Sequence, residues 1–384
     1  MIYLWYLIQF LIGYNLVLPV ILYLLFLWNK SRVQKTKLPA AVGLQPDYAI
    51  IVTAYQEITH IPETVQSILN LKYTNFLCYV VLDNCTDISS LVFTDERVIL
   101  LKPEQVLGGN VRSHFYAIEH FRRKHDYLTI IDSDNIVDMY YLDEMNAALS
   151  QGFDAVQGLR AAKNLDSQYA SLDAARDIYY HFYDGKVLFT VGSSATLSGS
   201  GMTFSVELYQ QCLANRDVSG AGFDKVLQYE IVRRGHRIAF SERAIVYDQK
   251  TTRPAQLVNQ RARWINTWFK YARFGFRVLG LGVKRLNRNQ AIFGLVLLRP
   301  PLFIFLILSV ICAILNLFIV PAHSLFWLLA FGLFVLGFML PLRGADRRII
   351  NALKHIPSFI FYQVISLIHA GNANKRSVAT KHFE

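Results

Sequence analysis

The stretch "YLTIIDSDNIVD" (127–138) decides how this chain folds. It begins with an apolar run typical of a buried β-strand and continues into two carboxylates, Asp132 and Asp134, one residue apart. In open α/β sheets, ligands bind outside the carboxyl ends of the strands. A buried strand that ends at two carboxylates therefore predicts an α/β sheet with a ligand site at the carboxyl end of that strand.

The flanking segments alternate between strand-like and helix-like patterns, which predicts an α/β domain with a largely parallel sheet. The expected strands are 48–53, 76–84, 97–102 and 127–134, and the expected helices are 61–71 and 110–124. Polar groups also follow the first two strands, at 53–57 and 83–87. No glycine-rich phosphate loop follows the first strand, so the pattern does not fit a dinucleotide-binding unit or a P-loop.

Composition points to a membrane protein. Hydrophobic residues make up 53% of the 384 residues and charged residues only 17%. Residues 1–28 carry no charge, and 302–320 and 324–340 are apolar spans joined by a short uncharged turn. We expect one N-terminal and two C-terminal transmembrane helices. The first span is read as an uncleaved anchor rather than a signal peptide, because no basic segment precedes it.

Basic residues flank these spans on one side, which predicts that residues 30–300 are cytosolic, at an inner or plasma membrane. The net charge of +11 is explained by these membrane borders and their anionic lipids rather than by nucleic acid, so no nucleic-acid partner is expected. The four cysteines lack paired or metal-binding spacing, as is typical of reduced cytosolic thiols.

The Asp132–Asp134 pair has two chemical interpretations besides a solvated turn. Hard cations such as Mg²⁺ or Mn²⁺ accept one or two carboxylates together with phosphate oxygens and water. Alternatively, phosphatases of the haloacid dehalogenase type use the first aspartate of such a pair as a nucleophile. In those enzymes the motif usually opens the domain, whereas here three strand-like segments precede it.

Three downstream stretches could contribute to the same site. "AGFDKVLQYEIVRRG" (221–235) sets Asp224 at a helix start, where it is either a favourable dipole partner or a general base. "QRARW" (260–264) combines guanidinium groups suited to phosphate with an indole suited to a sugar ring. "SGSGMTFS" (198–205), which contains Gly201, is a tight turn or a close backbone approach to a sugar.

Taken in order, these residues resemble the D, DxD, D, QxxRW signature of family-2 glycosyltransferases. The matching positions are Asp83, Asp132–Asp134, Asp224 and Gln260–Trp264. The membrane-bound branch is the most similar, namely the cellulose, chitin-oligosaccharide, hyaluronan and poly-N-acetylglucosamine synthases. "AIIVTAYQE", "VQGLRAAKN" and "VYDQK" are also similar to this branch, so the resemblance covers about residues 45–275.

The resemblance implies a glycosyltransferase-A (Rossmann-like) fold, a nucleotide-sugar donor, with UDP expected, and a divalent cation, Mg²⁺ or Mn²⁺. By position, it assigns the donor pocket to Thr53, Ala54, Glu57, Asp83 and Asp132, with Asp83 at the uracil. It assigns the metal to Asp134 and the base that activates the acceptor hydroxyl to Asp224, with inversion at the anomeric carbon. Gln260, Arg263 and Trp264 would hold the diphosphate and the acceptor sugar.

Two departures from the family pattern stand out. Gly222 and Phe223 precede Asp224 where the family usually has Thr-Glu, and Gly108-Gly109-Asn110 replaces a Gly-Lys-Gly, with Arg112 as a candidate substitute cation. These departures give some support to a catalytically silent subunit of a synthase complex. The sequence does not decide whether the acceptor is a growing glycan or a lipid-linked sugar. It also does not decide whether the chain assembles with further copies of itself or with other polysaccharide-synthesis subunits.

The expected organisation comprises six segments. They are a transmembrane anchor (1–29), a basic linker (30–47), a cytosolic catalytic domain (48–275), an interfacial helix region (276–300), a transmembrane hairpin (301–342) and a cytosolic basic tail with a candidate interfacial helix (343–384).

Overall fold

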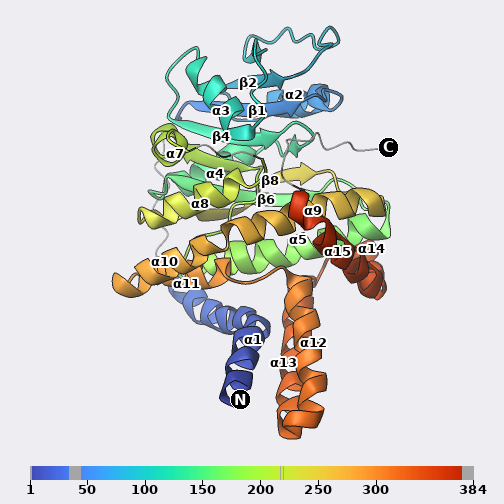
Figure 1. Cartoon of the computed structure of the whole chain (residues 1–384). Coiled ribbons are helices and arrows are strands. Elements are labelled where there is room, and N and C mark those ends of the chain that lie inside the picture. Colours follow the sequence, from blue (N-terminus) through green and yellow to red (C-terminus); the bar gives the residue numbers. More distant parts are fainter. Residues whose placement is uncertain (1, 34–44, 217, 219, 374–384) are drawn as a thin grey trace.

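The computed structural model describes residues 2–33, 45–216, 218 and 220–373. Figure 1 shows three tiers: an α/β tier at the top, a tier of helices lying across the middle, and three helices that project from the opposite end. Most of the expected basic linker and the last residues of the tail lie outside the described residues.

One mixed sheet of eight strands organises the top tier, in the order β3-β2-β1-β4-β7-β6-β8-β5. The strands are β1 (Tyr48–Tyr55), β2 (Phe76–Asp83), β3 (Val98–Leu101), β4 (Tyr127–Asp132), β5 (Ile136–Val137), β6 (Ala155–Ala162), β7 (Met202–Ser205) and β8 (Ala239–Asp248). The four expected strands are confirmed, as are both helices.

The expectation of a largely parallel sheet holds for only part of it. β3, β2, β1 and β4 run parallel, but β7 pairs antiparallel with both β4 and β6. β8 returns parallel to β6, and the short β5 pairs antiparallel with β8. The direction of β7 depends on pairing between segments more than 70 residues apart, since Leu128 lies opposite Phe204, and no local pattern reports it.

Alternating side chains of the strands feed two cores. On β1, Ala49 and Ile51 join one apolar cluster while Ile50 and Val52 join the other, as the two-residue period of a strand requires. The helices that pack around this sheet are α2 (Ile61–Leu69), α3 (Asn110–Glu119), α4 (Tyr141–Leu149), α7 (Val206–Leu213) and α8 (Phe223–Arg233). The sheet is therefore buried on both faces.

The middle tier consists of helices from several parts of the chain (Figure 1). They are α5 (Gln168–Tyr180), the π-helical η1 (His181–Val187), α6 (Leu188–Thr190), α9 (Pro254–Tyr271), α10 (Arg273–Lys284), α11 (Arg288–Leu297), α14 (Arg347–Ala352) and α15 (Ile356–His369), with short 3₁₀ turns at Leu353–His355 and Ala370–Asn372. α15 lies along α9, and Asn266 Nδ2 on α9 donates to the carbonyl of Ala370 at 2.8 Å. The first part of the expected tail is therefore docked against the catalytic domain.

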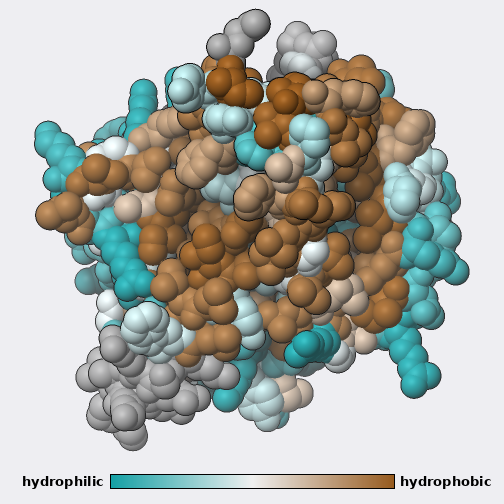
Figure 2. Space-filling model, turned by 90° about the horizontal axis from the view of Figure 1, so that it is seen from below, coloured by the Kyte–Doolittle hydropathy of each residue, from teal (hydrophilic) through white to brown (hydrophobic). Residues whose placement is uncertain are grey.

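Within the described residues, three helices are long and apolar enough to cross a membrane: α1 (Ile2–Val33), α12 (Leu302–Ile319) and α13 (Pro321–Met339). Seen from below, this end of the molecule is predominantly hydrophobic (Figure 2). A polar cluster joins the three helices. Gln9 Oε1 accepts from Asn316 Nδ2 at 2.5 Å and from Trp327 Nε1 at 2.9 Å, and Trp5 Nε1 donates to Asn316 Oδ1 at 3.0 Å. Buried polar groups that are paired across helices hold such a bundle together.

α10 and α11 form a hairpin with very close backbone contact. A Cβ on Gly282 would lie 2.3 Å from the backbone nitrogen of Ala291, and one on Gly294 would lie 2.5 Å from that of Leu279. Gly280, two residues before Gly282 on the same helix, has nothing within 4 Å of the corresponding position. Only the glycines at the contact are therefore required for packing.

We expect Gly282→Ala to destabilise the protein by roughly 1–3 kcal/mol, because the added methyl group overpacks the hairpin. Gly280→Ala should be neutral or stabilise by up to about 1 kcal/mol, since alanine favours helix more than glycine does. Thermal unfolding of the purified protein in detergent measures both. Equal shifts for the two variants would contradict the close packing.

Candidate active site

The carboxyl ends of the central strands bring the predicted polar residues together. In the strand register, Thr53 of β1 lies opposite Asp132 of β4, and Tyr55 lies opposite Asp83 of β2. A cavity of about 1230 Å³ opens at this edge and extends toward the membrane helices. The predicted site residues that line it are Thr53, Ala54, Glu57, Asp83, Asp132, Asp134, Asp224, Gln260, Arg263 and Trp264.

Asp83 is buried and shapes the loop that enters α3. Its Oδ1 accepts from the backbone nitrogen of Leu107 and its Oδ2 from that of Gly108, both at 2.8 Å. Gly108 adopts a φ of +65°, which favours glycine. Asp83 therefore holds Gly109 and Asn110 against the cavity, and its contact with a base stays a prediction.

Asn135 fixes the turn that carries Asp132 and Asp134. Its buried Nδ2 donates to Asp134 Oδ1 at 3.0 Å and to Asp248 Oδ1 at 3.3 Å, while its Oδ1 accepts from Ser200 Oγ at 2.6 Å. Ser200 Oγ also accepts from the backbone nitrogen of Asp132 at 3.0 Å. One amide therefore ties the Asp-x-Asp turn to the end of β8 and to the turn before β7.

The carboxylates at this edge repel one another. The pKa of Asp132 is raised to about 7, chiefly by burial; Arg160 acts to lower it, and the nearby Asp134, Asp248 and Asp224 act to raise it. Burial also acts to raise the pKa of Asp248, yet Arg160 and Lys250 hold it below its ordinary value. Asp248 is thus kept ionised by its cations, whereas Asp132 binds a proton more readily than an ordinary aspartate.

This donor set fits a hard divalent cation. Asp132 and Asp134 offer carboxylate oxygens at one edge of the cavity, which suits Mg²⁺ or Mn²⁺. Among the described residues, no group of three or more His, Cys, Asp or Glu side chains is arranged as a complete ligand set. For a cation held by these two carboxylates, substrate phosphates and water would supply the rest of the coordination shell, as is usual for Mg²⁺.

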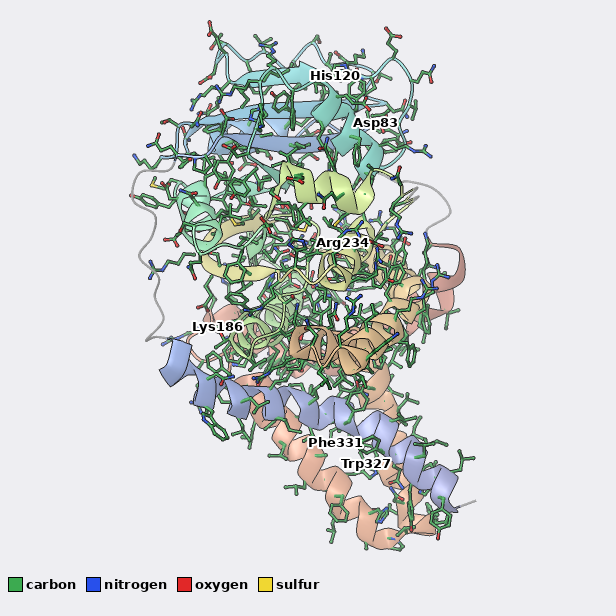
Figure 3. All side chains as sticks on the ribbon, turned by 90° about the vertical axis from the view of Figure 1, so that its left-hand side faces the viewer. Asp83, His120, Lys186, Arg234, Trp327 and Phe331 are labelled. Atoms are coloured by element: carbon green, nitrogen blue, oxygen red, sulfur yellow. The ribbon has the colours of Figure 1, made fainter. Side chains whose placement is uncertain are left out.

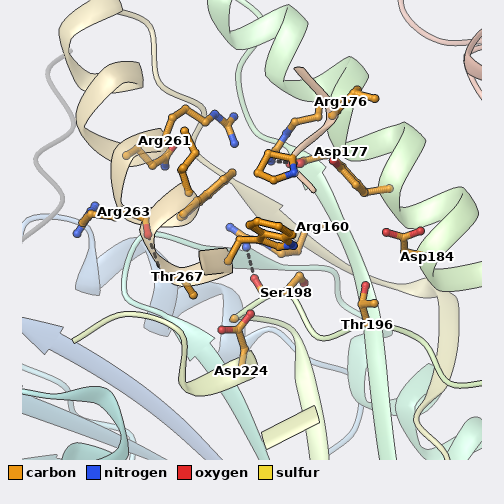
Figure 4. A pocket seen from close by; sticks show the side chains of 18 of the residues that line it. Arg160, Arg176, Asp177, Asp184, Thr196, Ser198, Asp224, Arg261, Arg263 and Thr267 are labelled. Carbon is orange, nitrogen blue, oxygen red and sulfur yellow. Dashed lines mark hydrogen bonds and ion pairs between the residues drawn. The ribbon is translucent and has the colours of Figure 1, made fainter. Parts of the chain in front are cut away.

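Asp224 begins α8 and faces the cavity (Figure 4). Its Oδ2 lies 2.9 Å from Lys225 Nζ, which also donates to the carbonyl of Leu197 at 2.8 Å. Phe223 is buried, and its ring meets that of His114 edge to face at 5.1 Å. The unusual Phe223 thus serves the core beside α3 as well as bordering the cavity.

The Gln260–Trp264 segment lies on α9, as predicted, but its two arginines have different surroundings. Arg261 is buried and pairs with Asp173 of α5, although it also borders the cavity. Arg263 lines the cavity, and Gln260 Oε1 is buried there without a hydrogen-bond partner among the described residues. The guanidinium carbons of Arg261 and Arg176 lie 4.0 and 4.4 Å from the centroid of the half-exposed Trp264 ring.

A buried network of alternating charges underlies the site. Lys250 pairs with Asp248 at 2.7 Å and with Asp177, and Arg160 pairs with Asp248 at 2.7 Å. Arg176 then bridges Asp177 at 2.5 Å and Asp173 at 3.2 Å. This network joins β6 and β8 to α5 and, through Arg261, to α9.

Two predicted site residues are not in the cavity. Arg112 lies on the exposed side of α3, where its Nη1 donates to the carbonyl of Leu107 at 3.2 Å, so the helical phase turns it away from the donor end. The backbone nitrogen of Gly201 donates to Ile130, and its carbonyl accepts from Gly158, at 2.9 and 2.8 Å. The sheet uses both groups, and Ser198 and Gly199 border the cavity instead.

The sequence from residue 46 to residue 267 matches the family model "Glycosyltransferase like family 2", which covers more than half of the chain. The chain belongs to the family-2-like glycosyltransferases. It is thus an enzyme of sugar transfer, and the phosphatase interpretation is wrong. No curated protein matches the sequence.

Two solved structures are similar to this chain. The mannosyltransferase PcManGT from Pyrobaculum calidifontis, solved in complex with GDP-Man and Mn²⁺, is similar with a TM-score of 0.53 and 14% identity, over 94% of this chain and 98% of that chain. TarS 1-349 of S. aureus in complex with UDP-GlcNAc gives a TM-score of 0.45 and 15% identity, over 85% and 90% of the two chains. The first comparison supports a glycosyltransferase-A-like fold for this glycosyltransferase.

The sequence interpretation missed Asn135, Ser200 and the roles of Asp248 and Lys250. Asp248 and Lys250 lie in "VYDQK", which was noted only for its resemblance. Asn135 directly follows the Asp-x-Asp pair, so its position beside two carboxylates was the available signal. Asn135 donates to Asp248, which lies 113 residues away in the sequence, so no local pattern reports this contact.

Gly222 positions the start of α8 and thus Asp224. Its φ is +100°, and a Cβ there would lie 2.5 Å from Thr267 Cγ2 and 2.8 Å from Tyr271 Cε2. Gly235, just beyond the other end of α8, has a similar φ of +96° but nothing within 4 Å. Substituting each glycine in turn therefore distinguishes the effect of backbone strain, which both positions share, from the effect of contact with α9, which only Gly222 has.

We expect Gly222→Ala to lower the rate of sugar transfer at least tenfold, because the clash with α9 displaces Asp224 and small misplacements of reacting groups slow catalysis strongly. Gly235→Ala should cost only the roughly 1–2 kcal/mol of left-handed strain and leave the rate within about twofold. Turnover and thermal unfolding measured on both variants test this. A similar loss of rate in Gly235→Ala would refute the positioning role of Gly222.

Proposed function

We propose that this chain is an inverting, divalent-cation-dependent glycosyltransferase that moves a sugar from a nucleotide sugar to a hydroxyl of a saccharide or lipid-linked acceptor. The observation that carries the proposal is the convergence of Asp132, Asp134 and Asp224, from two distant segments of the chain, on one cavity. A protein with no chemistry to perform gains nothing from clustering carboxylates that repel one another, which argues against a silent subunit.

The donor is proposed to bind at the β1 and β2 end of the cavity. Thr53, Ala54 and Glu57 would border the nucleotide, and the loop held by Asp83 would close over it. The similar fold of the mannosyltransferase solved with GDP-Man and Mn²⁺ supports a nucleotide-sugar donor and a divalent cation. UDP is the nucleotide that we propose, on the family resemblance.

Asp134, with Asp132 beside it, would hold the cation, which would neutralise the diphosphate as it departs. Arg263 and Gln260 reach the same cavity from α9 and would contact the diphosphate or the acceptor. Trp264 offers a half-exposed ring for stacking against a sugar, and its orientation is supported by the two guanidinium groups beside it.

Asp224 is proposed as the general base. The acceptor hydroxyl oxygen would attack the anomeric carbon from the side opposite the diphosphate, and its proton would pass to the Asp224 carboxylate. The bond between the anomeric carbon and the diphosphate oxygen breaks with its electron pair leaving on the nucleoside diphosphate. A single displacement of this kind inverts the anomeric configuration.

We propose that the reaction takes place at the cytosolic face of the membrane, in the synthesis of a surface or exported glycan. Lys284 and Arg285 precede α12, and Arg347 and Arg348 follow α13, so both ends of the hairpin carry the basic residues typical of cytosolic loops. The α/β tier and the hairpin tip lie at opposite ends of the molecule, as the positions of Asp83, Trp327 and Phe331 indicate in Figure 3.

Asp134→Ala tests the metal role. We expect it to reduce sugar transfer by at least 10³-fold in the presence of Mn²⁺, because electrostatic stabilisation of the leaving group is usually the largest catalytic contribution. Asp143→Ala, which removes an exposed carboxylate on α4, is the matched control and should retain wild-type activity. Release of nucleoside diphosphate from UDP-glucose, UDP-GlcNAc and GDP-mannose measures both variants. Full activity of Asp134→Ala would contradict the proposed metal role of Asp134.

Asp224→Asn separates donor binding from transfer. The amide has nearly the shape of the carboxylate but accepts no proton, so we expect transfer to fall at least 10²-fold while UDP still stabilises the protein thermally. Transfer at the wild-type rate would show that another group takes the proton.

A further inference from the structure

The cavity changes character toward the membrane. Beyond the polar groups at the strand ends, side chains of α12 and α13 form its wall, and they are apolar. The principal ones are Leu306, Val310, Ile311, Phe334, Val335 and Phe338. A single cavity thus joins the catalytic carboxylates to the interior face of the transmembrane hairpin.

The apolar part opens sideways where hydrocarbon would surround the hairpin. Val310 and Val335 both line the cavity, yet they are 46% and 54% exposed. Both lie on helices that are long and apolar enough to cross a membrane. An occupant of this part can therefore enter from the bilayer without passing through water.

A buried ion pair lies in the wall of the cavity where α12 begins. Arg299, just before α12, pairs with Asp184 of η1, and both line the cavity. The hydroxyl of Tyr179 and Nε of Arg299 are buried without hydrogen-bond partners among the described residues. Because Asp184 already balances the charge of Arg299, this part of the wall suits uncharged polar groups, such as the oxygens that link a headgroup to its chains.

From this geometry, and resting on the proposed function, we infer that the acceptor is a membrane lipid with a hydroxyl-bearing headgroup, whose hydrocarbon chain lies between α12 and α13 while the hydroxyl reaches Asp224. A growing glycan fits the apolar part poorly. Each sugar hydroxyl buried there would lose its water without gaining a partner, which is unfavourable.

The base also distinguishes two kinds of lipid acceptor. A headgroup hydroxyl is neutral and must lose its proton as it attacks, and Asp224 takes that proton. A polyprenyl phosphate is already ionised and needs no base. In the inferred step the hydroxyl oxygen bonds to the anomeric carbon, the nucleoside diphosphate leaves with the bonding electrons, and the product is a glycolipid one sugar longer.

The test narrows the apolar part with tryptophan and compares matched positions. Val310→Trp and Val335→Trp place an indole in the cavity wall. Ile314→Trp on α12 and Leu336→Trp on α13 place it at positions that are 52% and 69% exposed but not part of the wall. The full-length enzyme in nanodiscs is assayed with dioleoylglycerol, monoglucosyl dioleoylglycerol, polyprenyl phosphate and cellobiose as acceptors.

We expect transfer to a hydroxyl-bearing lipid, with kcat/KM reduced at least tenfold by Val310→Trp and Val335→Trp, mainly through KM, and within twofold of wild type for both controls. As a second measurement, a monoglucosyl lipid with a diazirine at its chain end should label α12 or α13 of the wild-type enzyme. Unmodified lipid should suppress that labelling.

Equal or better transfer to cellobiose, transfer to polyprenyl phosphate that Asp224→Asn does not slow, or equal effects of wall and control variants would each overturn the inference. Failure of the proposed function looks different. In that case the wild-type enzyme would neither hydrolyse nor transfer from any nucleotide sugar, whereas donor hydrolysis without lipid transfer would count against the lipid acceptor alone.

Discussion

Repulsion among carboxylates at the carboxyl edge of the sheet is the constraint on which the rest of the site depends. Asp134, Asp224 and Asp248 all lie close enough to Asp132 to act on its pKa, and each acts to raise it. Arg160 and Lys250 both pair with Asp248, so compensation is concentrated at one carboxylate. A divalent cation bound beside Asp132 and Asp134 would relieve this repulsion and, through its own charge, would attract the diphosphate of a donor.

The compensating cations also connect the tiers of the molecule. Buried charges are tolerated only with partners, so each member of the Lys250–Asp177–Arg176–Asp173–Arg261 chain needs its neighbours to stay where they are. The chain begins on the segment after β8, crosses α5 and ends on α9, which carries Gln260, Arg263 and Trp264. The α9 side of the cavity is therefore held in place relative to the carboxylates by electrostatics as well as by apolar packing.

Features with a local cause were predictable from the sequence, and features that depend on distant partners were not. The four strands β1 to β4, the helix that begins at Phe223 and the spans near Leu302 and Pro321 each follow from a short apolar pattern, whereas β5 to β8 were not predicted. By contrast, the antiparallel direction of β7 and the docking of α15 on α9 arise from pairings far apart in the chain. The prediction that Arg112 lines the site was wrong, because its position on the turn of the helix decides whether a side chain faces the cavity. The prediction for Gly201 was wrong because a glycine required for close packing and one required for a ligand look alike in sequence.

The division of the cavity has a consequence for catalysis. A hydrocarbon chain bound along α12 and α13 takes no part in the reaction. The free energy of its binding can therefore position the headgroup, and such remote interactions can increase the rate of the chemical step. The polar link atoms of the lipid would be stable beside Arg299 and Asp184, where chain carbons would not, and this would set how far the headgroup extends. A hydroxyl at the matching distance from this ion pair would lie beside Asp224, while one nearer or farther would not. Acceptor choice would then depend on headgroup length more than on the identity of the chain.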